Sequence, residues 1–249
     1  MIRATTARLD TRAAEAVRSG QNDGHAPAAA AAVTLSAAAE RGGATFGADR
    51  AAARQAGRNP ASITLVTVTK KFPMSHVRAA VAAGLVHLGE NRVQEALTKI
   101  PAAAELPITW HLIGHVQSNK ARKAAETFSW IHSVDSVGLL RRLEHSAQDN
   151  HAATAKLSLL VQVDLAGEAT KHGTEVDAVS DILWAATKCD AVEVRGLMLI
   201  PPRQDDPESV RPFFRRLREL RDTLVEDGVP PTMLHELSMG MSQDFDVAI

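Results

Sequence analysis

The stretch from residue 63 to residue 71 reads Ile63-Thr64-Leu65-Val66-Thr67-Val68-Thr69-Lys70-Lys71, and it predicts the fold class. Its first seven residues are all β-branched or aliphatic, which is typical of a buried strand. The apolar residues that follow, from Val77 to Gly84, recur at helical spacing. A short apolar strand followed by an amphipathic helix is the repeating unit of α/β proteins with parallel sheets.

The same alternation continues along the chain. Segments with helical spacing run from Val93 to Pro101 and from Val210 to Gly228. The strand candidates after the first one, which is Ile63 to Thr69, are Val86 to Leu88, Thr109 to Gly114, Trp130 to Val134, Leu157 to Asp164, Val192 to Ile200 and Met233 to Met239. Strands with helical crossovers at this spacing predict an α/β barrel of the (β/α)8, TIM-like type, with an open doubly wound sheet as the alternative.

The two ends of the chain depart from this alternation. Residues 1–50 are rich in Ala, Gly and Arg and contain few large side chains, so we expect a peripheral helix and a loose tail there, with the barrel domain at residues 51–249. At the other end, the last helix candidate runs from Gln243 to Ile249, and no eighth strand follows it. The sequence therefore predicts a barrel that is incomplete at its C-terminal end.

Composition argues against several classes of function. The 249 residues carry a formal net charge of -1, so no overall positive field attracts nucleic acid or anionic lipid. No apolar run approaches the roughly 20 residues of a membrane-spanning helix, and no apolar segment of a secretory signal follows the N-terminal arginines. Cys189 is the only cysteine, which excludes an internal disulfide and a cysteine-based zinc cluster. We expect a cytoplasmic protein without nucleic-acid or membrane partners.

Lys70 is the first candidate for chemistry. Because side chains alternate along a strand, Lys70 shares a face with Val66 and Val68, whereas Lys71 points to the other face. Barrel active sites are built at the carboxyl ends of strands, and a lysine in apolar surroundings has a lowered pKa and attacks aldehydes as the free amine. Taken alone, the pair is more simply interpreted as two lysines that only solvate the exit of a strand.

Two further strand ends carry polar candidates. Gly89-Glu90-Asn91 follows the second strand, where Asn91 either caps the next helix or points its amide into the mouth of the barrel. In Trp110-His111-Leu112-Ile113-Gly114, His111 is either a ligand contact or a hydrogen-bonded residue of the core. The pair His111 and His115 spans a strand end rather than one helix face, so the sequence predicts no metal site.

The turn Ser238-Met239-Gly240-Met241-Ser242 lies between the last strand candidate and the last helix candidate. It combines two hydroxyl groups, the backbone N–H groups expected at the start of a helix, and a glycine that permits close approach of the backbone. These features suit a phosphate group. Many turns of this kind bind nothing, so the turn gains weight only if one ligand occupies both the turn and Lys70.

Five motifs, in this order, resemble the pyridoxal 5'-phosphate (PLP) homeostasis protein family. They are Val68-Thr69-Lys70; Gly89-Glu90-Asn91-Arg92-Val93-Gln94-Glu95; Trp110-His111-Leu112-Ile113-Gly114 with Gln117-Ser118-Asn119-Lys120; Arg195-Gly196-Leu197-Met198; and Leu237-Ser238-Met239-Gly240-Met241-Ser242. The similarity extends from about Asn59 to Ile249 and includes the loop from Gly167 to Gly173, whereas residues 1–50 show no match.

The resemblance implies a PLP barrel of fold type III, like the N-terminal domain of alanine racemase. Lys70 matches the lysine that forms the Schiff base with PLP in this family. Asn91 is expected to line the cofactor pocket, and the turn after the last strand is expected to hold the phosphate. The full set of expected cofactor-binding residues is Lys70, Asn91, His111, Ser238, Gly240 and Ser242.

One departure from the family concerns the end of the chain. Members of the family continue beyond the position of Ile249 through a last strand, whose Arg-x-Gly-Thr type segment completes the phosphate site. That segment is absent from this sequence. We therefore expect an open seam in the barrel, with exposed strand edges and a phosphate site reduced to one turn.

Three functions remain open. The first is a PLP-binding protein of PLP homeostasis, which holds the cofactor, delivers it to PLP-dependent apoenzymes and balances amino and keto acids without an established turnover; its main partner is PLP, and we favour a monomer. The second is a weak amino-acid racemase of the same barrel type, although a two-base mechanism with lysine and tyrosine is excluded because the chain contains no tyrosine. The third is a truncated remnant that no longer binds PLP.

Overall fold

The computed structural model describes residues 32–38, 42–150, 155–167 and 172–249. In this part of the chain the strands form a closed parallel barrel in the order β1 to β8. The strands are β1 (Ala32–Ala38), β2 (Ile63–Val68), β3 (His87–Glu90), β4 (Thr109–Leu112), β5 (Trp130–Val134), β6 (Leu157–Gln162), β7 (Val192–Met198) and β8 (Glu236–Ser238).

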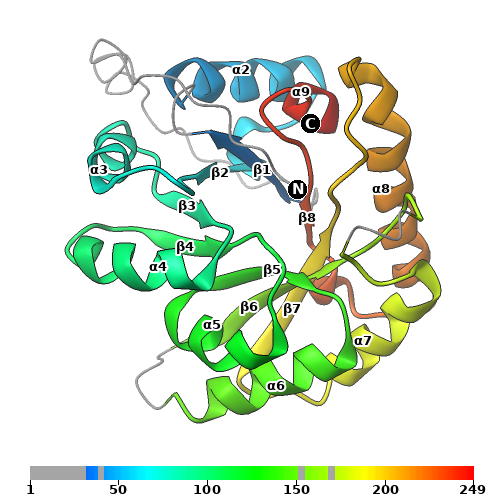
Figure 1. The fold of residues 1–249 in the computed structure, drawn as a ribbon. Helices are drawn as coiled ribbons and strands as arrows, with labels where there is room; N and C mark the ends of the chain where they lie inside the picture. The colour runs from blue at the N-terminus through cyan, green and yellow to red at the C-terminus, as the bar shows by residue number, and fades with distance from the viewer. Residues whose placement is uncertain (1–31, 39–41, 151–154, 168–171) are drawn as a thin grey trace.

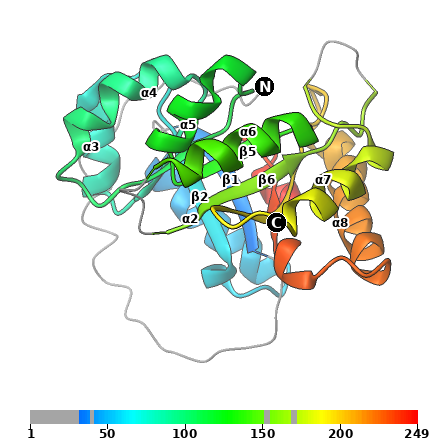
Figure 2. The same ribbon diagram turned by 90° about the horizontal axis from the view of Figure 1, so that it is seen from below.

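The helices surround this barrel (Figure 1). They are α2 (Gly42–Gln55), α3 (Met74–Ala82), α4 (Val93–Lys99), α5 (Ala121–Thr127), α6 (Val137–Gln148), α7 (Val179–Ala186), α8 (Arg211–Glu226) and α9 (Phe245–Ala248). In both views α3 and α8 lie on opposite sides of the strands (Figure 2). From β2 to β8, each strand is therefore joined to the next by a connection that runs over the outside of the barrel.

The predicted fold class is confirmed. Each of the seven strand candidates from Ile63 onward corresponds to one strand from β2 to β8; β5 has the predicted bounds, and the others differ by a few residues at their ends. The alternative of an open doubly wound sheet is wrong, because the strands close on themselves. The helix predicted from Val210 to Gly228 corresponds to α8.

β1 was not predicted from the sequence. This strand lies in the Ala-rich segment that was assigned to a peripheral helix and tail, and it pairs in parallel with β2 and β8. Val33 lies opposite Ile63 on one side and Leu237 on the other. The strands from β2 to β8 form an incomplete barrel, as predicted, but β1 fills the gap between β8 and β2. The expected open seam is therefore closed in the structure.

The main core lies between the strands and the helices. Trp110 and Leu112 of β4 point into this layer, as do Leu140 and Leu143 of α6. The hydroxyl of Ser136 accepts a hydrogen bond from a backbone N–H in the first turn of α6 at 3.2 Å, which fixes the start of this helix. This layer holds the helices on the barrel and leaves the carboxyl ends of the strands available for a site.

A second, smaller apolar cluster belongs to side chains that alternate with those of the main core and therefore point into the barrel. Its buried members are Val66, Val68, Ile113, Leu160 and Met198. Buried polar side chains share the interior with it, notably His111, His132 and Ser238. The inside of the barrel is thus apolar on one part of its wall and hydrogen-bonded on another.

Candidate functional site

The carboxyl end of β2 carries Lys70. Val66 and Val68 belong to the interior cluster, so the alternation of side chains directs Lys70 toward the same interior. Lys70 is half-buried, whereas Lys71 is exposed. The chain turns sharply at Lys71, whose φ of 63° lies in the left-handed region that non-glycine residues rarely adopt. The different exposure of the two lysines agrees with the assignment of Lys70 to the barrel interior.

Lys99 on α4 holds the residue before Lys70. Its buried ammonium group donates to the Thr69 carbonyl oxygen at 2.6 Å and to Oε1 of Glu90 at 2.8 Å. The Thr69 hydroxyl donates to the same Glu90 oxygen at 2.8 Å. Glu90 is 0% exposed, and this burial raises the pKa of its carboxyl group although Lys99 and Thr69 act in the opposite direction. Both the backbone and the side chain of Thr69 are thereby fixed.

Glu95 holds the residue after Lys70. Its Oε1 accepts a hydrogen bond from the Lys99 ammonium group at 2.6 Å and another from the backbone N–H of Lys71. Glu95 and Lys99 are an i, i+4 pair on α4. From the sequence, Glu95 was identified only as part of a motif, and Lys99 was not identified. The i, i+4 spacing of opposite charges was the signal that could have identified this pair.

Asn91 directly follows the last residue of β3 and is half-buried. Its Oδ1 is buried and has no hydrogen-bond partner among the described residues. The N-cap of α4 is Arg92, and no side chain caps this helix. Gly114 packs so closely on Asn91 that a Cβ at position 114 would lie 2.2 Å from the Asn91 carbonyl oxygen. Of the two interpretations of Asn91, the capping bond is not observed, and a buried amide oxygen without a partner fits a ligand contact.

Ser238 is the last residue of β8, and the predicted phosphate turn follows it. Ser238 and Ser242 are both buried, and Gly240 has a φ of 84°, which glycine adopts without strain. The helix predicted from Gln243 to Ile249 corresponds to α9, but α9 begins only at Phe245 and is four residues long, so the expected N–H groups of a helix start lie beyond the turn. The turn therefore offers hydroxyl groups and a freely approached backbone, and the anion-binding end of a helix does not contribute.

Asp244 limits what this turn can bind. Its carboxylate accepts a hydrogen bond from the N–H of Met241, so this N–H is already used. Burial raises the pKa of the Asp244 carboxyl group. A full negative charge on Asp244 opposes a phosphate in the same turn, so the hydroxyl of Ser238 becomes the more important donor.

His111 lies inside the barrel on β4 and is 2% exposed. Its Nε2 is 3.0 Å from Nδ1 of His87, and its Nδ1 is 2.9 Å from Nε2 of His132. The Trp130 ring stacks on it with 5.7 Å between ring centroids. Both ring nitrogens are therefore engaged with other histidines, as in the interpretation of His111 as a hydrogen-bonded core residue, and its contribution to cofactor binding stays a prediction. His87 and His132 were not identified from the sequence, although strand alternation alone could have indicated them.

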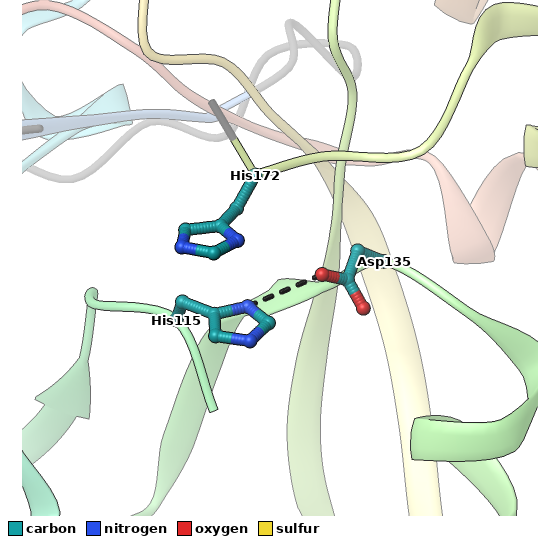
Figure 3. Close-up of side chains that lie close together, drawn as sticks. All are labelled: His115, Asp135 and His172. Carbon is teal, nitrogen blue, oxygen red and sulfur yellow. Dashed lines mark ion pairs between the residues drawn. The ribbon is translucent and has the colours of Figure 1, made fainter. Parts of the chain in front are cut away.

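A further polar cluster, shown in Figure 3, lies just after β4 and β5. Nδ1 of His115 is 3.2 Å from Oδ2 of Asp135, and the His115 ring stacks on the His172 ring with 3.8 Å between centroids and 9° between planes. The three residues offer ligand atoms within 4.8 Å of one another. However, imidazole lone pairs lie in the ring plane, so two parallel stacked rings do not converge on one ion. The expectation that the chain has no metal site stays a prediction.

Comparison with known proteins identifies the family of this chain. The family described as "Alanine racemase, N-terminal domain" matches residues 50–245. The "Pyridoxal phosphate homeostasis protein" of Pseudomonas aeruginosa is 41% identical over 200 residues, which cover 80% of this chain and 83% of the relative. The protein of the same name from Aquifex aeolicus is 39% identical over 198 residues, which cover 80% of this chain and 85% of the relative. The chain belongs to the pyridoxal phosphate homeostasis protein family.

Among solved structures, PipY of Synechococcus elongatus is similar to this member of the family. The two chains are 39% identical over 81% of this chain and 92% of PipY, with a TM-score of 0.70 to PipY without PLP and 0.69 to PipY with PLP bound. Alanine racemase from Streptomyces coelicolor is 19% identical with a TM-score of 0.59, which shows the shared fold alone. The resemblance inferred from the five motifs is confirmed. The part of the quoted loop from Glu168 to Lys171 lies outside the described residues.

Proposed function

We propose that this chain binds PLP through Lys70 and serves PLP homeostasis by holding the cofactor and delivering it to PLP-dependent apoenzymes. The observation that carries this proposal is that Lys70 is half-buried at the carboxyl end of β2, between Thr69 and Lys71, whose backbones are held by Lys99 and Glu95. Val66 and Val68 belong to the interior cluster, and strand alternation directs Lys70 to the same side. The names of the curated relatives and the PipY structure with PLP bound support it.

The residues near Lys70 fit this cofactor. When bound, PLP supplies an aldehyde that bonds reversibly to a lysine amine and a ring that withdraws electrons from an attached amino acid. Lys70 supplies the amine, and the interior cluster around Val66 and Val68 gives this end of the site an apolar wall. Asn91 offers a buried Oδ1 that has no partner within the described ranges and suits a polar group of the ligand.

The phosphate end of the site is the turn after β8. Ser238 and Ser242 present hydroxyl groups there, and Gly240 lets the backbone approach an anion closely. Hydrogen bonds to a charged phosphate oxygen are stronger than those between neutral groups. Two anchors, a lysine at one end of the ligand and hydroxyl donors at the other, hold a small molecule in one orientation while the covalent link remains reversible.

Holding and delivery are favoured over catalysis by the residues present. A racemase that exchanges a proton on both faces of an amino acid requires two acid–base groups, and in the alanine racemase type of site the second one is a tyrosine. This chain contains no tyrosine. A slow side reaction of an amino acid at Lys70 remains compatible with the site, because an attached amino acid has an acidified α-proton.

We propose PLP as the main partner, a monomeric state and a cytoplasmic location. The single cysteine, Cys189, fits a reducing compartment. A formal net charge of -1 gives no general attraction to nucleic acid. Within the described ranges, no helix has the length and apolarity required to cross a membrane.

The proposal is tested with Lys70→Ala and the matched control Lys71→Ala, because Lys71 is adjacent but exposed. Each protein is incubated with PLP, desalted and examined by absorbance spectroscopy. We expect wild type and Lys71→Ala to retain the absorbance of lysine-bound PLP and Lys70→Ala to lose it. Folded wild type that retains no PLP would overturn the proposal and favour a non-binding remnant. Delivery is measured separately as recovery of activity by a PLP-dependent apoenzyme mixed with the loaded protein.

A further inference from the structure

Four side chains form a continuous hydrogen-bonded chain across the inside of the barrel. Nδ1 of His87 is 3.0 Å from Nε2 of His111, Nδ1 of His111 is 2.9 Å from Nε2 of His132, and Nδ1 of His132 is 2.9 Å from Oγ of Ser238. The chain crosses from the first residue of β3 through β4 and β5 to the last residue of β8. It ends on the hydroxyl group that begins the proposed phosphate turn.

The three histidines of this hydrogen-bonded row, His87, His111 and His132, are neutral near pH 7. His111 is 2% exposed and His132 is 0% exposed, and His87 is half-buried. Burial lowers the pKa of His132 to about 3, and it lowers the pKa of His111 and of His87 below the ordinary value; for His111 the neighbouring histidines act in the same direction. A neutral imidazole carries one N–H donor and one acceptor nitrogen.

Because each neutral imidazole has one donor and one acceptor nitrogen, the proton positions of the three histidines and Ser238 depend on one another. In one arrangement each histidine donates from Nδ1, so that His132 donates to the Ser238 oxygen and the Ser238 hydrogen is free for another acceptor. In the reverse arrangement Ser238 donates its hydrogen to Nδ1 of His132, and His132 and His111 then donate from Nε2. If some of the four residues followed one arrangement and the rest followed the other, two donors or two acceptors would face each other at one of the contacts.

We propose that His87, His111 and His132 are positioning residues that direct the hydroxyl hydrogen of Ser238 toward a phosphate oxygen of the ligand. This inference rests on the proposed function, because PLP supplies the phosphate. A phosphate oxygen accepts hydrogen bonds, so it selects the arrangement in which every histidine donates from Nδ1. This hydrogen-bonded row of histidines thereby links ligand binding at β8 to the tautomer of His87 on β3, and it gives His111 a role that requires no contact with the ligand.

The direct test reads the tautomers in the wild-type protein. Protein labelled with 15N-histidine is saturated with PLP, uptake is confirmed by absorbance, and the ring nitrogens are assigned by long-range 1H–15N correlation. We expect His111 and His132 to carry their proton on Nδ1 in the loaded protein. A loaded protein with the proton on Nε2 of these residues would overturn the inference and leave PLP binding intact. A protein that takes up no PLP would overturn both proposals.

A second test measures coupling between His132 and Ser238, with pyridoxal as the ligand that lacks the phosphate. We expect Ser238→Ala to weaken PLP binding about tenfold or more and to change pyridoxal binding little, because a hydrogen bond to a charged group is lost. His132→Asn should weaken PLP binding in the presence of Ser238 and have little further effect in Ser238→Ala. Equal effects of His132→Asn in both backgrounds, or equal effects on the two ligands, would contradict the inference.

Discussion

The ammonium group of Lys99 lies 2.6 Å from the carbonyl oxygen of Thr69, the residue that precedes Lys70. Through this contact, α4 controls the position of a residue at the end of β2, a different element of the barrel. Glu90 at the end of β3 completes the contact, because it accepts from both Lys99 and the Thr69 hydroxyl. The backbone next to Lys70 is therefore fixed by the charged groups of Lys99 and Glu90, on the helix side of the strands.

Removal of Lys99 is expected to destabilise the protein strongly, because it leaves the Glu90 carboxylate buried and unpaired. We predict that Lys99→Met lowers the free energy of unfolding by about 3 kcal/mol. The control is Lys123→Met, which breaks an exposed pair with Glu126 and should cost less than about 0.5 kcal/mol. Both effects are measured by urea denaturation of wild type, Lys99→Met, Lys123→Met and the double variant Lys99→Met with Glu90→Gln. The double variant should recover part of the stability that Lys99→Met loses. Equal, small effects of the two lysine substitutions would contradict this account.

Burial of histidines predicts sensitivity to acid. Burial lowers the pKa of His132 to about 3, so between that value and about pH 6.5 His132 is protonated only in the unfolded chain. The unfolded state then binds more protons, and stability falls with falling pH by about 1.4 kcal/mol per pH unit for this group. His111 acts in the same direction because burial lowers its pKa as well.

This slope is measured as the difference between wild type and His132→Asn in urea denaturation across this pH range. Buried carboxyl groups with raised pKa values, such as Glu236, act with the opposite sign but cancel in the difference. The control is His145→Asn, since the His145 side chain is 79% exposed. A difference that does not change with pH would show that His132 is protonated in the folded protein.

Much of the barrel could be predicted from the sequence because its signal is local. Short apolar runs such as Ile63 to Thr69 identified the strands β2 to β8, and alternation along one run identified Val66 and Val68 as interior residues, which predicts the same side for Lys70. β1 was not predicted, because it lies in an alanine-rich segment with weak strand propensity and forms through pairing with β2 and β8. Its existence depends on a gap that only the assembled barrel creates.

The hydrogen-bond networks of the histidines and of Lys99 could not be predicted from the sequence for a related reason. Each of them joins residues from different strands or helices, such as His87 with His111 or Lys99 with Thr69, and these contacts depend on strand register and on the packing of α4. The motif that contains Glu90 and Glu95 was visible, but its physical role was not. The helix after β8 begins at Phe245 instead of Gln243, and the bond from the Met241 N–H to Asp244 in the turn before it is a contact that the sequence pattern does not reveal.

Gly114 is expected to tolerate no side chain. A Cβ at this position would lie 2.2 Å from the Asn91 carbonyl oxygen, so Gly114→Ala must displace the backbone at Asn91. We predict a loss of about 1–3 kcal/mol in stability, together with weaker PLP binding. The control is Gly138→Ala on α6, where a Cβ meets nothing within 4 Å, and its stability should be unchanged or slightly higher. Unaltered PLP binding by folded Gly114→Ala would argue against a role for Asn91 in the site.

The cluster of His115, Asp135 and His172 is expected to bind no metal ion tightly. The stacked histidine rings, with 9° between their planes, do not direct their lone pairs at a common point. Isothermal titration calorimetry with zinc and with nickel tests this, with His115→Gln as the comparison. Stoichiometric binding that disappears in His115→Gln would show that the rings turn to coordinate an ion, and the prediction of no metal site would then be wrong.

We propose that Lys70 is the residue that holds PLP, and this is tested by identifying the lysine that PLP modifies. The wild-type protein is saturated with PLP and treated with borohydride, which makes the bond between PLP and a lysine permanent, and proteolytic fragments are examined by mass spectrometry. When unbound PLP is removed before reduction, we expect one modified residue, Lys70. Lys71 should be unmodified because it is exposed and loses reversibly bound PLP on desalting, and Lys99 because it is buried in its ion pairs. Modification of Lys71 or of scattered surface lysines, with Lys70 unmodified, would contradict the proposal.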